Sequence, residues 1–374
     1  MAGSHAAAPL MRVLVVNAGS ATLKLAAVTV DGEGLRGEHE RLVDPWHDGD
    51  DTGLESALAE IGPVDAVGHR VVHGGSEMTE PTLVDDAVLD RIEALTSLAP
   101  LHQPRALAGL SAARRLRPEQ PHVACFDTAF HATMPAAART YALPQQWRER
   151  WGLDRFGFHG LSHAWSARRG PEVAGVEARR TVVCHLGSGA SLCAVLDGRS
   201  VDTTMGFTPL EGLVMGTRSG TVDPGLVLWL LEHTTLTAAE VEDGLVRRAG
   251  LAGLSGTDGD LRHVLAERDE GSAAAALAVD VMVHRLVREL GGMVASLGGL
   301  DLLVFTAGIG EHVPEVRAAV AERLVHLGVA VDPARNDAAE GDTDLTADGA
   351  PVATVVVEAR EGLEIARQVH DLLI

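Results

Sequence analysis

The stretch RVLVVNAGSATLKLAAVTVDG, residues 12–32, joins two apolar runs through a short polar segment that contains Gly19 and Ser20. Strand-forming residues on both sides of a Gly-Ser turn predict a β-hairpin. The stretch TVVCHLGSGASLCAVLDG, residues 181–198, repeats this plan, because two apolar runs again flank Gly-Ser and the second run again ends in Asp-Gly. A repeat at a spacing of about 170 residues predicts a duplicated domain.

The glycine turns of these hairpins are candidate anion sites. Turns of this kind can direct backbone N–H groups at a phosphate, but they are also common in ordinary hairpins, and the sequence leaves both interpretations open. The segment NAGSATLK at 17–24 is not a Walker A loop, because it lacks the second glycine and the GK[ST] ending. A third glycine-rich stretch, VFTAGIGEHVPEVRAAV at 304–320, reads as strand, turn and helix, and could receive a nucleotide at the helix N-terminus.

The length and composition favour a two-domain α/β protein. The chain has 374 residues, more than one typical domain. Hydrophobic residues make up 46% of it and aromatic residues only 3%, so the core must consist mainly of Ala, Val and Leu, as in α/β enzymes. Strand-like runs alternate with helical patterns: we expect strands within 66–73, 122–131, 301–308 and 352–359, and helices within 85–100, 223–233, 237–248, 272–297, 314–327 and 361–374.

The charge balance excludes some partners. With 52 acidic and 31 basic side chains, the formal net charge of −21 disfavours nucleic acid and anionic membrane surfaces. An anionic substrate would therefore need a local basic pocket.

The cysteines and the N-terminal residues indicate the cellular compartment of the protein. Cys125, Cys184 and Cys193 lie inside apolar runs without a CxxC pair, which indicates reduced core thiols in a cytoplasmic protein. No apolar run reaches the roughly 18 residues that span a bilayer, so we expect no membrane association. The start MAGSHAAAPL lacks the pattern of a secretion signal, and we expect residues 1–10 to be a flexible leader.

Seven motifs follow one another along the chain. They are NAGSATLK at 17–24, GHRVVHGG at 68–75, LAPLHQP at 98–104, FDTAFHATMP at 126–135, RFGFHGLSH at 155–163, HLGSGAS at 185–191 and DTTMGFTPLEGLVMGTRSG at 202–220. In these motifs, and over nearly all of the chain from residue 12 onward, the sequence resembles the acetate kinase family. That family belongs to a superfamily with sugar kinases, heat-shock ATPases and actin.

The resemblance implies an α/β fold of two duplicated actin-like (ribonuclease H-like) domains with a nucleotide cleft between them. The first domain would comprise residues 1–130 plus 363–374. The second domain, which would bind the nucleotide, would comprise residues 131–362. The family also suggests a homodimer.

The activity implied by the resemblance is reversible transfer of the γ-phosphoryl group of ATP to acetate, giving acetyl phosphate and ADP, with Mg²⁺ or Mn²⁺. A propionate or butyrate kinase stays open as an alternative, because an apolar slot discriminates by only about 1–3 kcal/mol per methylene. An alternative from another class is a non-enzymatic nucleotide switch of the actin or heat-shock type. Such a switch would have no need of Arg70, His159 or Arg218.

The resemblance assigns the residues that would act on the substrates. Arg70 would bind the substrate carboxylate, and Arg218 would stabilise the transition state, since guanidinium groups present paired donors and stay charged. His159 would hydrogen-bond the transferring phosphoryl group. The two arginines could instead be surface residues in ion pairs. The apolar wall of the substrate slot would consist of Val72, Leu101, Phe158 and Pro209.

Asp127 matches a position often described as the proton acceptor of the family. A carboxylic acid with a pKa of about 4.3 is already ionised at pH 7, so no proton needs to be removed from the attacking oxygen. We therefore expect Asp127 to order Mg²⁺ through water and to align the substrate. Asn17 and Glu361 match the other magnesium positions of the family, in keeping with a hard cation that prefers oxygen ligands.

The implied nucleotide contacts are spread over several segments. Asp260 and Arg262 could equally form an ion pair at a helix start. Thr22 replaces a usual Ser, Ser188 and His312 each stand where the family has Asn, and EAREGL at 358–363 replaces a run of the type PTNEEL. The full set of implied contacts is Lys24, His185, Leu186, Gly187, Ser188, Gly189, Asp260, Leu261, Arg262, Gly308, Ile309, Gly310, Glu311 and His312.

Overall fold

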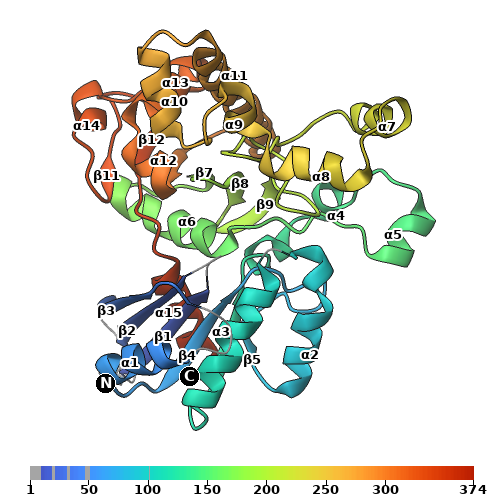
Figure 1. Ribbon diagram of the computed structural model, residues 1–374. Coiled ribbons are helices and arrows are strands. Elements are labelled where there is room, and N and C mark those ends of the chain that lie inside the picture. The colour runs from blue at the N-terminus through green and yellow to red at the C-terminus, as the bar shows by residue number, and fades with distance from the viewer. Residues whose placement is uncertain (1–9, 19–21, 32–33, 47–50, 101) are drawn as a thin grey trace. The chain divides into compact units, whose positions relative to one another are not determined.

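The computed structural model describes residues 10–18, 22–31, 34–46, 51–100 and 102–374, and the chain divides into two compact units. The first unit consists of Met1–Ala132, Gly160–Trp165 and Arg360–Ile374, and the second of Thr133–His159 and Ser166–Ala359. Each unit contains one six-stranded sheet (Figure 1). Residues 1–9 of the expected leader, and Gly19 and Ser20, lie outside the described residues. Among the described helices, none has the length and apolar character needed to cross a membrane.

The sheet of the first unit has the strand order β3-β2-β1-β4-β6-β5. The hairpin strands β1 and β2 are antiparallel, as are β2 and β3, whereas β1, β4 and β6 run parallel and β5 runs antiparallel to β6. The strands are β1 (Met11–Ala18), β2 (Leu23–Asp31), β3 (Gly34–Val43), β4 (Ala66–Val71), β5 (Thr82–Leu83) and β6 (His122–Phe126).

The sheet of the second unit repeats this topology. Its order is β9-β8-β7-β10-β12-β11, with β7, β10 and β12 parallel and the three other pairings antiparallel. The strands are β7 (Arg180–Leu186), β8 (Ala190–Leu196), β9 (Arg199–Thr203), β10 (Leu302–Thr306), β11 (Thr343–Asp344) and β12 (Ala353–Val356). Order and direction match those of the first sheet strand by strand, so the predicted duplicated α/β fold is confirmed.

The duplication extends to the register of the two hairpins. Asn17 pairs with Lys24 at the end of the first hairpin, and His185 pairs with Ser191 at the same place in the second. The pairing with the third strand shifts between Ala27 and Val28 in the first unit and between Ala194 and Val195 in the second. The shift begins at the same distance along each strand, because Ala27 follows Lys24 by as many residues as Ala194 follows Ser191.

Helices cover both faces of the first sheet. Leu14 and Val16 of β1 pack with Leu54 and Ala112, whereas the alternate residues Val13 and Val15 pack with the C-terminal helix. Gly68 permits this second contact, because a Cβ atom there would lie 2.5 Å from the side chain of Ile365. The helices are α1 (Thr52–Ile61), α2 (Asp86–Ala94), α3 (Gln103–Leu116) and α15 (Glu361–Leu373), with the single turns η1 (Thr96–Leu98) and η2 (Ala129–Thr133).

The second sheet is also covered on both faces. Gly170 brings α6 against β10, since its Cβ atom would lie 2.8 Å from Val304, and the long helix α11 covers β7, β8 and β9 on the other face (Figure 1). The helices are α4 (Ala136–Arg139), α5 (Gln145–Trp151), α6 (Gly160–Ala174), α7 (Pro224–His233), α8 (Ala238–Arg247), α9 (Gly250–Ser255), α10 (Leu261–Asp269), α11 (Ala273–Leu297), α12 (Ala307–His312), α13 (Pro314–Arg323) and α14 (Pro333–Asp337), with the turn η3 (Val325–Leu327).

Candidate active site

In the first unit, Arg70 and Asp127 meet at the carboxyl ends of two neighbouring parallel strands. Arg70 lies near the end of β4, and Asp127 directly follows β6, which pairs with β4. Arg70 Nη2 donates to Asp127 Oδ2 over 2.8 Å, and Arg70 Nε lies 3.1 Å from Oδ2 and 3.3 Å from Oδ1. Asp127 is only 1% exposed. Both carboxylate oxygens of Asp127 therefore hold Arg70.

Two carboxylates near Arg70 keep its guanidinium group positively charged. Burial opposes the charged form of Arg70, but Asp127 and Glu361 more than offset it and raise the pKa of the guanidinium above its usual value. Burial also raises the pKa of Asp127, and Glu361 adds to this effect, while Arg70 opposes it. Arg70 Nη1 forms no hydrogen bond with any residue in the described part of the chain. This donor is available to an anion.

The predicted metal ligands Asn17 and Glu361 lie in the same unit as Asp127. Glu361 is the first residue of α15, and its charge acts on both Asp127 and Arg70. Within the described residues, no three His, Cys, Asp or Glu side chains form a cluster that could hold a metal ion. Two neighbouring carboxylates and an amide are nevertheless the oxygen donors that Mg²⁺ takes when it keeps most of its waters.

In the second unit, the β7–β8 hairpin closes with the turn Gly187–Gly189. The Gly187 N–H donates to the Gly189 carbonyl over 3.0 Å, and Ser188 is exposed at the tip. A Cβ atom on Gly189 would lie 2.7 Å from Arg218 Nη2 and 3.4 Å from His159 Nε2. Glycine at this position thus allows an arginine and a histidine to approach the backbone of the turn.

His159 is held in a strained conformation beside this turn. It has φ 57°, in the left-handed region that costs a non-glycine residue free energy and is often found at functional sites. Its ring stacks on His185 at 4.1 Å between centroids, and Nδ1 lies 3.0 Å from Ser191 Oγ. Ser191 was not among the predicted site residues; its position opposite His185 in the hairpin could have indicated it.

Arg218 is a partly buried cation without an acidic partner. Its Nη1 donates to the Pro209 carbonyl over 2.6 Å, and it forms no ion pair with any carboxylate in the described part of the chain. Burial lowers the pKa of its guanidinium, because nothing nearby compensates for the lost hydration. The alternative that Arg218 is an ordinary surface arginine in an ion pair does not hold among the described residues, and a bound anion would be a favourable partner.

A cavity of about 750 Å³ opens beside Arg218 within the second unit. Eight of the predicted nucleotide contacts line it, namely Gly187, Ser188, Asp260, Leu261, Arg262, Gly308, Ile309 and His312. His185, Leu186, Gly189, Gly310 and Glu311 belong to the same hairpin and the same helix α12 but do not line it. Lys24 lies in the first unit, exposed on β2.

Asp260 and Arg262 form the ion pair that the sequence offered as the alternative to a nucleotide contact. The Asp260 side chain accepts from the Arg262 N–H at the start of α10, and Arg262 Nη2 donates to Asp260 Oδ2 over 2.5 Å. These hydrogen bonds lower the pKa of Asp260 to about 2. The ion pair at the helix start exists, and both residues also line the cavity.

The residues predicted to form the apolar wall of the substrate slot belong to both units. Val72 is partly buried after β4 in the first unit. Phe158 is 2% exposed and Pro209 is partly buried, and both belong to the second unit. Leu101 lies outside the described residues.

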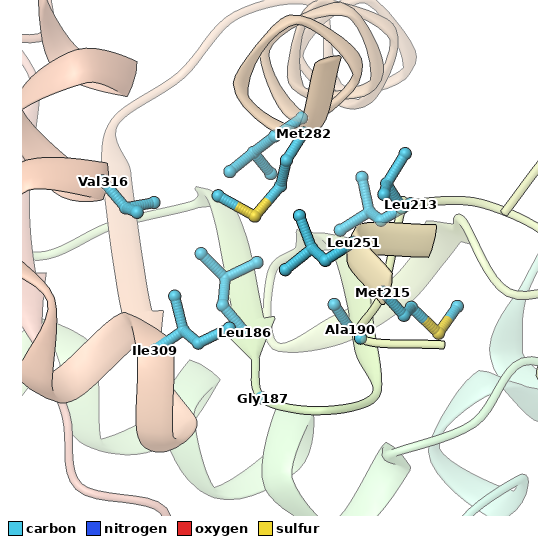
Figure 2. Close-up of a pocket in the computed structure, with 12 residues that line it drawn as sticks. Leu186, Gly187, Ala190, Leu213, Met215, Leu251, Met282, Ile309 and Val316 are labelled. Atoms are coloured by element: carbon cyan, nitrogen blue, oxygen red, sulfur yellow. The ribbon is translucent and has the colours of Figure 1, made fainter. Parts of the chain in front are cut away.

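Apolar packing supports the glycine turn from behind. Figure 2 shows Leu186 and Ala190 of the hairpin, Met282 of α11, Leu251 of α9 and Ile309 of α12 around a small cavity of about 20 Å³. Side chains from three helices thus pack against the base of the hairpin. A void this small is part of the packing rather than a ligand site.

Arg317 holds the other glycine-rich segment and was not predicted from the sequence. It is 1% exposed, and Nη1 donates to the carbonyls of Gly310 and Glu311 over 3.0 and 2.8 Å, at the end of α12. Asn336 binds its Nε over 2.7 Å. The carbonyl groups left unpaired at the end of α12 are thereby satisfied. No local pattern distinguishes this arginine from an exposed helical one.

Comparisons with known proteins agree with this geometry. A model of the Acetokinase family matches residues 51–367. An acetate kinase of Leifsonia xyli subsp. xyli is 45% identical, over 95% of this chain and 97% of that protein. An acetate kinase of Rhodopseudomonas palustris is 48% identical, over 82% of this chain and 77% of that protein.

Solved structures give the same result. The acetate kinase of Porphyromonas gingivalis superposes with a TM-score of 0.87 at 32% identity, covering 97% of this chain and all 100% of that one. A propionate kinase of Francisella tularensis superposes with a TM-score of 0.86 at 31% identity, covering 96% and 98%. With a family match over most of its length and relatives alike in sequence and fold, the chain belongs to the acetokinase family.

Proposed function

We propose that the chain catalyses reversible transfer of the γ-phosphoryl group of ATP to acetate, giving acetyl phosphate and ADP. The observation that carries this proposal is Arg218, a partly buried cation without an acidic partner among the described residues, next to a glycine turn, His159 and a nucleotide-sized cavity. Relatives that match nearly the whole chain are acetate kinases, which supports a phosphotransferase and disfavours a non-enzymatic nucleotide switch.

The residues of the second unit suit the phosphoryl donor. Phosphoryl transfer needs alignment of the attacking and leaving oxygens and neutralisation of charge on the moving group. Arg218 offers a fork of donors beside the Gly189 backbone, and His159 Nε2 lies on the same side of the turn. Ser191 contacts the Nδ1 edge of the His159 ring, and His185 stacks on the face of that ring. The γ-phosphoryl group would therefore meet hydrogen-bond donors of Arg218 and His159 that are already in position.

The residues of the first unit suit the acceptor. Arg70 Nη1, which has no hydrogen-bond partner among the described residues, would bind the substrate carboxylate, while Asp127 holds the other edge of the guanidinium. The acetate oxygen attacks as an anion, so the site needs no general base.

Mg²⁺ fits the oxygen donors of the first unit, where Asp127, Glu361 and Asn17 would hold it through water. When bound, the ion supplies positive charge to the phosphate oxygens. Asp127→Asn should raise the Mg²⁺ concentration needed for half-maximal activity, because the amide attracts a hydrated cation less than a carboxylate does. Asp90→Asn, an exposed change on α2 of the same unit, serves as the control. An unchanged magnesium profile in Asp127→Asn would exclude this role.

A propionate kinase is the second candidate, because one solved structure similar to this chain bears that name. The test is kcat/KM for acetate, propionate and butyrate, measured by trapping the acyl phosphate as a hydroxamate. We expect a preference for acetate of roughly 10-fold per added methylene. A clear optimum at three or four carbons would replace the acetate assignment, and ATP turnover that ignores all three acids would refute the proposed function.

The two arginines should differ in their kinetic effects. Arg218→Ala should lower kcat on the order of a thousandfold with little change in the KM for acetate, because its charge acts mainly in the transition state. Arg70→Ala should raise the acetate KM about ten- to a hundredfold, through loss of a charged hydrogen bond. Arg323→Ala, an exposed arginine on α13, is the control. Near-normal kinetics in both variants would refute the site.

We also propose a homodimer, and exposed apolar side chains of the second unit support it. Within α5 and α7 no residue is buried, and Trp147, Trp151, Leu228 and Trp229 are between 50% and 58% exposed. Large exposed apolar side chains such as those of the apolar helix α7 are typical of an interface, and a second copy of the chain would cover them. Sedimentation equilibrium should give a dimer that Leu228→Glu dissociates. A monomeric wild-type protein at micromolar concentration would contradict this.

The cysteines support a cytoplasmic location, which we also propose. Cys125, Cys184 and Cys193 are all buried thiols outside any disulfide, and burial raises the pKa of each. Such thiols suit a reducing compartment. Recovery of the protein outside the cytoplasm on cell fractionation would contradict this location.

A further inference from the structure

The loop that carries Pro209 and Arg218 has no regular secondary structure of its own. β9 ends at Thr203, and the next helix, α7, begins at Pro224. Arg218 nevertheless lies against Gly189, and among the described residues its one hydrogen bond goes to the Pro209 carbonyl in the same loop. Something outside the loop must therefore set its conformation.

The segment before His159 supplies the first anchors. The N–H groups of Phe156 and Gly157 both donate to the Gly206 carbonyl, over 3.1 and 3.2 Å. Phe207 donates its N–H to the hydroxyl of Tyr141 over 2.9 Å. Tyr141 is the only tyrosine of the chain. These bonds tie the start of the loop to residues that lie just before His159.

Arg155 ties down the same part of the loop. Its Nη1 donates to the carbonyls of Thr203, Thr204 and Met205 over 3.0 to 3.3 Å, and Nη2 donates to Glu211 Oε1 over 2.6 Å. The guanidinium also lies over the Tyr141 ring, 5.3 Å from its centroid. Burial opposes the charge of Arg155, but Tyr141 and Glu211 more than offset it and hold its pKa above the usual value.

Glu211 joins the two anchors. Oε1 accepts from Arg155, and Oε2 accepts from the Tyr141 hydroxyl over 2.5 Å. The side chains of Glu211 and Tyr141 meet directly over Gly206, where a Cβ atom would lie 1.8 Å from Glu211 Oε2 and 2.1 Å from the Tyr141 oxygen. Glycine is required there for this contact to form. We call Tyr141, Arg155 and Glu211 the clamp.

The clamp is connected to both residues assigned to the phosphoryl group. Glu211 lies two residues after Pro209, whose carbonyl receives Arg218, and Arg155 lies four residues before His159. The Arg155–Glu211 ion pair is only partly buried, with 16% and 33% of the two side chains exposed, and such pairs contribute little net stability, so stability alone does not account for this cluster. It does, however, restrict the orientation of the groups it joins.

We propose that the clamp is a positioning device that sets the Pro209 carbonyl, and through it the Arg218 guanidinium, for phosphoryl transfer. Its three members are positioning residues, since they act on the reacting group through Arg218 and the backbone before His159. The inference rests on the proposed function and adds to it the residues that make Arg218 effective. A displacement of about 1 Å at such a site can cost a factor of a hundred in rate.

The test uses two variants of the full chain. Tyr141→Phe removes one oxygen atom, and Glu211→Gln keeps the size of the side chain but removes its charge. In both we expect kcat for acetyl phosphate formation to fall at least about tenfold, while the KM for ATP stays within about twofold of wild type. Asp197→Asn, which breaks the exposed ion pair with Arg179 in the same unit, is the matched control and should leave kcat unchanged.

A double-mutant cycle then separates positioning from general loosening of the fold. If the clamp acts through Arg218, Glu211→Gln should cost much less in kcat when Arg218 has been changed to Lys than in the wild-type background. Equal losses in the two backgrounds, or kcat within twofold of wild type in both single variants, would overturn the inference. Should Glu211→Gln fail to fold, Tyr141→Phe decides in the same cycle. A wild-type protein that forms no acyl phosphate would overturn the proposed function and the clamp together, whereas an active wild type with normal variants overturns the clamp alone.

Discussion

Arg218 is a positive charge that has no acidic partner among the described residues, and the chemistry proposed for the second unit depends on it. The sequence contains 52 acidic residues against 31 basic ones, yet Arg218 forms no ion pair with any carboxylate in the described part of the chain. Partial burial of a guanidinium costs hydration, and burial here lowers the pKa of Arg218 for that reason. An anion bound beside Gly189 would recover this cost. Folding has already paid the cost of dehydrating and orienting the guanidinium, so an anion that binds there would not have to meet it again. This is electrostatic preorganisation.

The duplicated sheet explains how such a charge comes to lie beside a glycine turn. Each unit has a hairpin at the same place in the same topology, and its second strand pairs with the third strand with the same irregularity. In the second unit the turn carries Gly187 and Gly189, and the absence of side chains lets Arg218 and His159 reach the backbone. Parallel strands β4 and β6 of the first unit deliver Arg70 and Asp127 to one edge in a comparable way.

Several features could be predicted from the sequence because they are local. Apolar runs on both sides of Gly-Ser mark a hairpin, and their repetition marks a duplication. The expected α/β class and family followed from these patterns and from motifs, and both are confirmed. Ser188 and His312, the departures from the family pattern, lie exposed at the cavity, where a change of side chain leaves the backbone turn and α12 intact.

The supporting residues could not be predicted, because their contacts join distant segments. Arg317 is held by Asn336 from 19 positions away, and Glu211 meets Tyr141 from 70 positions away. Asp127 was expected chiefly at the metal, yet its oxygens also hold Arg70, which only the pairing of β4 with β6 reveals. The specificity of these contacts comes from tertiary packing, which no short sequence pattern records.

The most direct measurement asks whether Arg218 binds the phosphoryl group more strongly in the transition state than in ATP. Calorimetric titration should compare two ligands: ATP alone, and ADP with aluminium fluoride and acetate, which mimics the phosphoryl group in transit. The account predicts that Arg218→Ala weakens binding of the mimic about a hundredfold or more and binding of ATP less than about threefold. An equal loss for both ligands would contradict it, because Arg218 would then bind the ground state as strongly as the transition state.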